Sequence, residues 1–149
     1  MSPLRPAQRE SIMRRLSFLQ VELSDLQEYN GLTYEEYQTD RRVRREVERL
    51  VENLANACLD IVKIILAGEN LEVPSTYSLA FARLSEAGLI PHDLAKDLAA
   101  LARTRNVLAH QYLDIKWERL HHFLRHGPRL LARFVEIVER KLEESAEEA

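Results

Sequence analysis

The sequence contains little of what disulfide-rich, turn-rich or membrane proteins need. Among its 149 residues there are one cysteine, four glycines and five prolines. The single cysteine, Cys58, excludes an internal disulfide, so a reducing cytoplasm is the expected compartment. The scarcity of glycine and proline favours helices over a turn-rich β fold. The longest apolar run, residues 59–67, is interrupted by Asp60 and Lys63, and we therefore expect no membrane span.

Composition is typical of a globular protein, with 46% apolar and 30% charged residues. The length predicts a single domain, residues 1–149, that is large enough for a buried core. The formal charge of -3 argues against a protein that coats nucleic acid nonspecifically. The arginines are nevertheless clustered, which leaves two interpretations open: a local basic surface or a solvated helix face. The clustered residues are Arg41, Arg42, Arg44, Arg45, Arg49, Arg103 and Arg105, and an acidic tail follows at 143–149.

Apolar residues recur at helical spacing and predict an all-α fold, an antiparallel bundle of about five helices. Asn30-Gly31 ends the first helix, and Asp40 is the expected N-cap of the second. Gly127-Pro128 falls within the last helix and is expected to kink or interrupt it, because proline lacks an amide donor and clashes with the preceding turn. The predicted helices cover residues 7–29, 41–67, 75 or 76 to 88, 91–110 and 116–144, with a short turn at 34–38.

The most informative segment is residues 105–112, near the end of the fourth predicted helix. It places Arg105, His110 and Tyr112 within eight residues. Arginine binds phosphate through a planar fork of donors, and histidine is the side chain whose charge changes near neutral pH. These two groups are what phosphodiester chemistry needs in the absence of a metal, so we expect no metal and no cofactor.

The spacing of the two charged residues constrains where they can act. Arg105 and His110 are five residues apart, so on an ideal helix their side chains point about 140° from each other. They meet at one substrate atom only if the helix ends near His110, or if a second copy of the chain supplies one group. The spacing therefore favours a site at a helix end or across a symmetric dimer interface.

The string Arg105-x4-His110-x-Tyr112, followed by Leu-Asp-Ile, resembles the signature of the HEPN superfamily. More narrowly, it resembles the HepT toxins, which are encoded beside a minimal nucleotidyltransferase antitoxin. A lone Arg-x4-His would be a weak signal, but the flanking segments follow the same family in the expected order. These segments are residues 45–50, 57–61, 73–77 and 81–91, and the resemblance covers about residues 41–142.

The resemblance implies the toxin of a toxin–antitoxin system, a metal-independent endoribonuclease that acts as a homodimer, with tRNA as one expected substrate. The chemistry is credible because RNA carries its own nucleophile in the 2′-hydroxyl. His110 is the expected base or acid, and Arg105 is expected to hold the phosphate. Asn106 and Tyr112 are expected supporting residues. In similar toxins the nucleotidyltransferase transfers AMP to a tyrosine of this motif, which here is Tyr112.

Three features depart from the family pattern. Family members often have Ile-Asp-Pro at the start of the last helix, whereas this chain has Ile115-Lys116-Trp117, so either Asp114 is the cap or the turn differs. The Gly-Pro pair at 127–128 is unexpected in that helix. The segment 1–31 is longer than the core pattern requires.

The same residues also permit purely structural interpretations. Arg105 and His110 can be a structural pair near a helix C-terminus, where cations are stabilised by the helix dipole. Tyr112 is as well explained by a buried, hydrogen-bonded core tyrosine as by a modified residue. On this interpretation the chain is a catalytically inactive HEPN module that dimerises and serves as a binding scaffold.

Other polar residues leave further alternatives. A stripe on the second long helix, Asn53, Asn56, Asp60 and Lys63, either borders the active cleft or forms an exposed face. In the first case Asp60 pairs with Arg105 or orients His110. Cys58 lies in an apolar stretch, which favours an inert buried thiol. Glu118, His122 and His126 share a helix face, but without a fourth ligand we expect no metal there.

Overall fold

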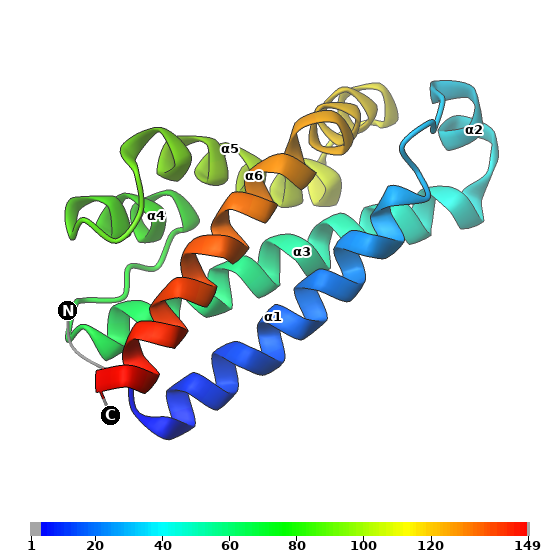
Figure 1. The fold of residues 1–149 in the computed structure, drawn as a ribbon. Coiled ribbons are helices and arrows are strands. Elements are labelled where there is room, and N and C mark those ends of the chain that lie inside the picture. Colours follow the sequence, from blue (N-terminus) through cyan, green and yellow to red (C-terminus); the bar gives the residue numbers. More distant parts are fainter. Residues whose placement is uncertain (1–3, 149) are drawn as a thin grey trace.

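The computed structural model describes residues 4–148, and all regular structure within this range is helical. The five expected long helices are present, and the predicted turn at 34–38 is a short helix of its own, so the described range contains six. They form an antiparallel bundle, as expected (Figure 1). The helices are α1 (Pro6–Gln27), α2 (Tyr34–Thr39), α3 (Arg41–Gly68), α4 (Tyr77–Glu86), α5 (His92–His110) and α6 (Leu113–Glu148).

Short-range signals set several helix ends. The Asp40 carboxylate accepts hydrogen bonds from the backbone N–H groups of Arg42 and Val43, at 3.0 and 3.2 Å, which confirms it as the N-cap of α3. Thr76 caps α4 in the same way, accepting from the N–H of Leu79 at 3.3 Å. After α4, Gly88 has φ +76°, a left-handed conformation in which any other residue is strained. The connection to α5 is therefore a tight reversal.

The helix α3 is the centre of the core. The buried side chains Leu54, Ile61 and Leu66 of this helix belong to one apolar cluster that includes Phe81 of α4 and Phe134 of α6. The helix α1 packs along α3, so the amino-terminal segment that the family pattern did not require belongs to this core (Figure 1). None of the helices in residues 4–148 is long and apolar enough to cross a membrane.

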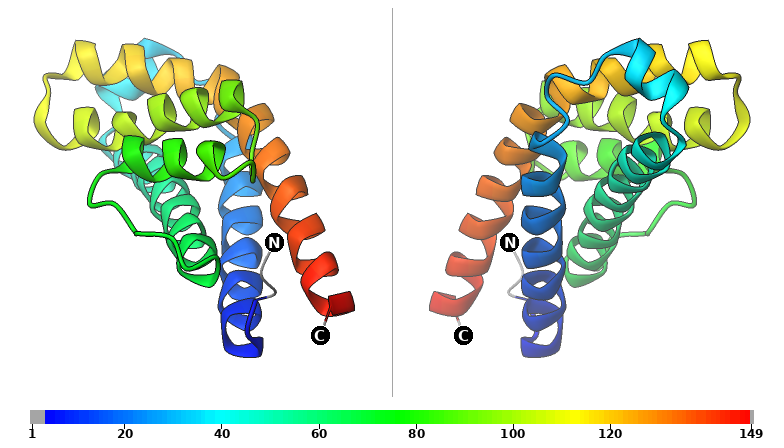
Figure 2. Two further views of the ribbon diagram at one scale, coloured as in Figure 1. Left: turned by 90° about the vertical axis from the view of Figure 1, so that its left-hand side faces the viewer. Right: turned by 90° about the vertical axis from the view of Figure 1, so that its right-hand side faces the viewer.

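The helix α6 bends at its proline but does not break. It continues from Leu113 to Glu148 with Pro128 inside it. Figure 2 shows that its first half crosses the top of the bundle before the second half turns down beside α1. The bend confirms the expected kink, because proline removes one backbone hydrogen bond and displaces the preceding turn. At Gly127 a Cβ atom would lie 2.9 Å from the Phe123 ring, so the glycine allows this buried ring to pack against the helix backbone.

The start of α6 differs from the prediction. The helix begins at Leu113 and not at Lys116, so Asp114 lies in its first turn and is not its cap. Lys116 forms an ion pair with Glu48 of α3 at 3.6 Å. The Trp117 ring lies 5.7 Å from the ring of Tyr34 and 5.4 Å from that of Tyr37, centroid to centroid. Lys116-Trp117, found where the family often has Asp-Pro, thus attaches α6 to α2 and α3.

Candidate functional site

The Arg-x4-His-x-Tyr motif lies where α5 ends. His110 is the last residue of α5, and the backbone N–H of the next residue, Gln111, closes the helix by donating to the Val107 carbonyl at 3.0 Å. Only Gln111 and Tyr112 separate α5 from α6. The helix therefore stops at the histidine, as expected from the predicted helix 91–110. The structure does not bring the Arg105 and His110 side chains into contact within residues 4–148.

The Arg105 side chain is half-buried and held in place. Its Nη1 donates a hydrogen bond to the hydroxyl oxygen of Tyr77, the first residue of α4. Its guanidinium carbon lies 5.6 Å from the centroid of the same ring, within the range of a cation–π contact. The Tyr77 hydroxyl in turn donates to Asn56 Oδ1 of α3 at 3.4 Å. The arginine of the motif is thus connected to two other helices.

Sequence reasoning did not single out Tyr77. The only available signal was its position in the segment 73–77 that resembles the family. Arg103, which is exposed, donates to Ser78 Oγ at 3.2 Å, so two arginines of α5 lie against the first turn of α4. This end of α5 is therefore locally positive although the whole chain carries a formal charge of -3.

The other motif residues are open to solvent. His110 and Asn106 are exposed, and Tyr112 is 82% exposed. Within the described range, no hydrogen bond or ion pair engages the side chains of these three residues. The prediction of a buried core tyrosine at position 112 is therefore wrong. Its phenol is accessible to a second protein or a second copy of the chain.

The polar side chains of the α3 stripe contact two neighbouring helices, α1 and α4. Asp60 forms an ion pair with Arg15 of α1 at 3.8 Å, and Asn53 donates to Glu22 of α1 at 2.9 Å. The alternative in which Asp60 pairs with Arg105 or orients His110 is therefore wrong, since the structure directs this carboxylate to Arg15 of α1. Asn56 takes that place, because it is the stripe residue connected to Arg105 through Tyr77.

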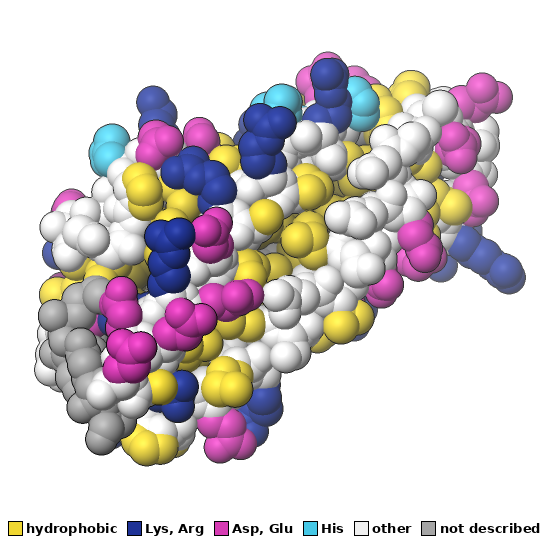
Figure 3. Space-filling view, viewed as in Figure 1, with side chains coloured by type: hydrophobic (Ala, Val, Ile, Leu, Met, Phe, Trp, Pro, Cys, Tyr) yellow, Lys and Arg dark blue, Asp and Glu magenta, His cyan; other side chains and the backbone are white. Residues whose placement is uncertain are grey.

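Charge is segregated along α6. Between Arg119 and Arg133 this helix carries no acidic residue, whereas several acidic side chains gather towards its carboxyl-terminal end (Figure 3). The same view shows histidine, lysine and arginine side chains along the upper edge of the molecule, with some acidic side chains among them. A surface cavity of about 430 Å³ between α5 and α6 is lined by Asp97, Ala100, Leu101, His122, Arg125, His126, Arg129 and Leu130.

The histidines of this cavity are in contact with each other. The ring centroids of His122 and His126 are 4.5 Å apart. Partial burial, followed by the charges of His126, Arg119 and Arg125, lowers the pKa of His122. No group of three or more metal-ligating side chains occurs among the residues that the structure describes. Arg119, Arg125 and Arg129 outnumber the one carboxylate of the cavity, Asp97, and this balance of charge suits an anion better than a metal ion.

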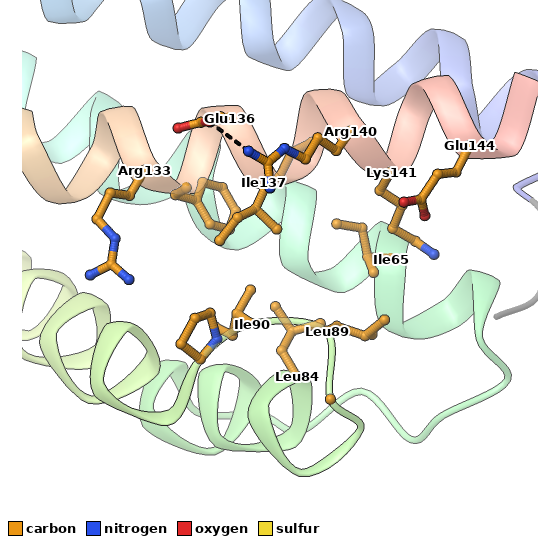
Figure 4. A pocket seen from close by; sticks show the side chains of 14 residues that line it. Ile65, Leu84, Leu89, Ile90, Arg133, Glu136, Ile137, Arg140, Lys141 and Glu144 are labelled. Carbon is orange, nitrogen blue, oxygen red and sulfur yellow. Dashed lines mark hydrogen bonds and ion pairs between the residues drawn. The ribbon is translucent and has the colours of Figure 1, made fainter.

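A second cavity, of about 620 Å³, lies away from the motif. It lies between α6 and the connection from α4 to α5, and its lining includes the apolar residues Ile65, Leu89 and Ile137 and the charged residues Arg133 and Arg140 (Figure 4). None of the motif residues lines it. The motif therefore occupies an open surface, which is compatible with a long polymeric substrate.

Cys58 is buried, and this burial raises the pKa of its thiol. An inert thiol was expected, and the surroundings agree with that expectation, because the nucleophilic thiolate is disfavoured in an apolar site. Cys58 therefore does not belong to the site.

A sequence model of the family described as ribonuclease HepT-like matches residues 19–138. The chain belongs to this family. The match begins within α1 and ends within α6, so the family pattern extends further towards the amino terminus than the 41–142 expected from the motifs. The resemblance to HepT is thereby confirmed.

Similar proteins share the fold at low sequence identity. The mRNA nuclease HepT of Shewanella oneidensis is 21% identical over 103 residues, which cover 69% of this chain and 77% of that protein. The tri-AMPylated HEPN toxin of Shewanella oneidensis, solved in complex with MNT antitoxin, has a TM-score of 0.78 at 19% identity, covering 87% of this chain and 97% of that one. YutE from Bacillus subtilis, a cytosolic protein of unknown function, also has a TM-score of 0.78, at 18% identity, covering 97% and 94%. The chain therefore has the HEPN fold that its motif predicted.

Proposed function

We propose that this chain is the toxin of a toxin–antitoxin pair and an endoribonuclease that needs no metal. The observation that carries the proposal is the end of α5 in a HepT-like chain, where Arg105 is held in place and His110 is open to solvent. The relative named mRNA nuclease supports RNA as the substrate. Messenger RNA and tRNA are both substrate classes to test.

The reaction that these residues support is transesterification of RNA. His110 accepts the proton of the 2′-hydroxyl while the 2′-oxygen forms a bond to phosphorus. The bond from phosphorus to the 5′-oxygen breaks, and a second imidazole returns a proton to that oxygen, leaving a 2′,3′-cyclic phosphate. Arg105 binds the non-bridging oxygens, whose negative charge grows in the transition state. Asn106 is assigned a supporting role, orienting the phosphate through its amide.

A homodimer would supply the second imidazole and bring arginine and histidine together. Large apolar side chains are exposed around the motif: Leu79 at 57% in the first turn of α4, Tyr112 at 82%, and Ile115 at 39% in the first turn of α6. Such side chains at one end of a protein favour a contact with another protein surface. We assign this contact to a second copy, because the spacing of Arg105 and His110 is satisfied most simply across a two-fold axis.

The basic part of α6, residues 119–133, carries arginines and no acidic residue, which supports a polyanionic substrate. Arg125 and Arg129 belong to the cavity between α5 and α6, together with His122 and His126. Arginine neutralises backbone phosphates and releases counterions, which supplies affinity without sequence preference. Because the chain is negative overall, we expect RNA to bind at this surface and at the motif and not elsewhere on the protein.

The proposed partner is a minimal nucleotidyltransferase antitoxin, and Tyr112 is the proposed acceptor of AMP. In that step the phenol oxygen attacks the α-phosphorus of ATP and pyrophosphate leaves. The exposure of the Tyr112 side chain supports this role, and so does the AMPylated state of the related toxin. An adenylate would add negative charge and bulk within the motif, where the substrate phosphate has to bind.

Tyr112→Phe should abolish adenylylation while RNA cleavage persists, because only the phenol oxygen is lost. The measurement is mass spectrometry of the purified toxin after incubation with the antitoxin and ATP. The matched control is Tyr34→Phe, since Tyr34 is 37% exposed on α2, and this variant should still gain AMP. An AMP adduct that persists in Tyr112→Phe would assign the modification to another side chain.

The function itself is tested by tightly controlled expression of the wild type and of His110→Ala in a bacterial host, with growth and the integrity of total RNA and tRNA compared. We expect the wild type to arrest growth and cleave RNA, and the variant to do neither. Purified wild type should keep its activity in EDTA. If neither protein harms growth and purified, unmodified wild type leaves RNA intact, the chain is the inactive HEPN binding module instead.

A further inference from the structure

We propose that Tyr77 is a positioning residue for RNA cleavage, and that Asn56 fixes it in the orientation that Arg105 requires. The inference rests on the proposed function and assigns a role to two residues outside the Arg-x4-His-x-Tyr motif. Its basis is a continuous set of contacts that connects α3, α4 and α5 at the side chain expected to bind the scissile phosphate.

The direction of each hydrogen bond determines what the hydroxyl can do. The Tyr77 O–H donates to Asn56 Oδ1 at 3.4 Å, which directs its proton away from the arginine. The lone pairs of the Tyr77 oxygen then remain for Arg105 Nη1, which can only donate. Asn56 thus helps to hold the Tyr77 hydroxyl in the orientation in which its oxygen faces the arginine.

The aromatic ring adds a second constraint on Arg105. The guanidinium carbon is 5.6 Å from the ring centroid, so the ring and the hydroxyl of Tyr77 both contact the cation. The Tyr77 ring itself is half-buried and packs against the core. Its backbone is also fixed, because Tyr77 is the first residue of a helix that Thr76 caps. A guanidinium has five N–H donors, so one bond to Tyr77 leaves the others for a phosphate.

This arrangement matters for rate because a long arginine side chain otherwise samples many rotamers. Preorganised donors stabilise developing charge without having to be reoriented during the reaction. Small displacements of such a group lower the reaction rate strongly. The loss of the Tyr77 hydroxyl should therefore reduce the catalytic step more than it reduces RNA binding, which the basic part of α6 can sustain.

The test begins with Tyr77→Phe, which keeps the ring and removes the hydroxyl. We expect kcat for a short RNA to fall about tenfold, with KM changed less than about threefold and Tm nearly unchanged. Asn56→Ala should lower kcat in the same direction, and Tyr34→Phe, which removes a hydroxyl at α2, should leave kcat unchanged. An unchanged kcat in Tyr77→Phe would overturn the proposal.

A double-variant cycle separates positioning from general structural support. In an Arg105→Lys background, Tyr77→Phe should lower kcat by less than about twofold, because the oriented fork is already gone. A full tenfold loss in both backgrounds would show that Tyr77 acts independently of Arg105 and would overturn the inference. A wild type that cleaves no RNA would overturn the proposed function and this inference together. An active wild type with additive variants would overturn the inference alone.

Discussion

Replacing Arg105 with alanine should lower the rate of RNA cleavage by about 10²–10³-fold, which is the usual cost of losing one donor to a developing oxyanion. Stability should change little, because the loss of the bond to Tyr77 costs about 1 kcal/mol and lowers Tm by only about 2–4 °C. The measurement is single-turnover cleavage of an end-labelled RNA by the purified protein in EDTA, together with thermal unfolding followed by circular dichroism.

The matched control for this prediction is Arg103→Ala. Arg103 is exposed on the same end of α5 and also contacts α4, through Ser78. Its removal changes the net charge by the same amount, and cleavage should fall by no more than about threefold, as for a peripheral charge. Equal losses in the two variants would show that the end of α5 contributes a general positive field and that Arg105 has no specific role at the phosphate.

Features of the fold that depend on neighbouring residues could be predicted from the sequence. Asp40 is followed by a strongly apolar pattern, so it was identified as the cap that the structure shows. Pro128 has a fixed local effect on a helix, and α6 bends as expected. The end of α5 at His110 was expected from the extent of the apolar helical pattern.

Features that depend on contacts between distant residues could not be predicted in this way. The start of α6 at Leu113 is stabilised by Lys116 and Trp117, whose partners Glu48 and Tyr37 are far away in the sequence. Periodicity gives the face of a helix but not its register against a neighbour. For that reason the sequence left open whether Asp60 lies beside Arg105 or on an exposed face.

The same limitation applies to Tyr77, whose contact with Arg105 spans 28 positions. A tyrosine at the beginning of a helix carries no sequence signal for such a contact. The exposure of Tyr112 likewise depends on how the short connection between α5 and α6 is oriented, and its residue type alone permits either burial or exposure.

Mixing two inactive variants should restore activity, because the active site is proposed to form across the dimer. Purified Arg105→Ala and His110→Ala proteins, unfolded together and refolded at equal concentrations, should recover cleavage up to about a quarter of the wild-type level, because a heterodimer keeps one imidazole as the base and water has to protonate the leaving 5′-oxygen. Random pairing gives half heterodimers, and each heterodimer has one of its two sites with both groups intact. Within one chain the Arg105 side chain is directed to Tyr77, whereas His110 is exposed beyond it, so neither variant can rebuild the site alone.

The control mixes His110→Ala with the double variant that lacks both side chains, and this mixture should remain inactive because no site receives His110. Native mass spectrometry of differently tagged chains measures how many heterodimers have formed. If heterodimers are abundant and the first mixture is still inactive, arginine and histidine act within one chain. The site would then need the end of α5 to rearrange when RNA binds, since the two side chains point about 140° apart on a regular helix.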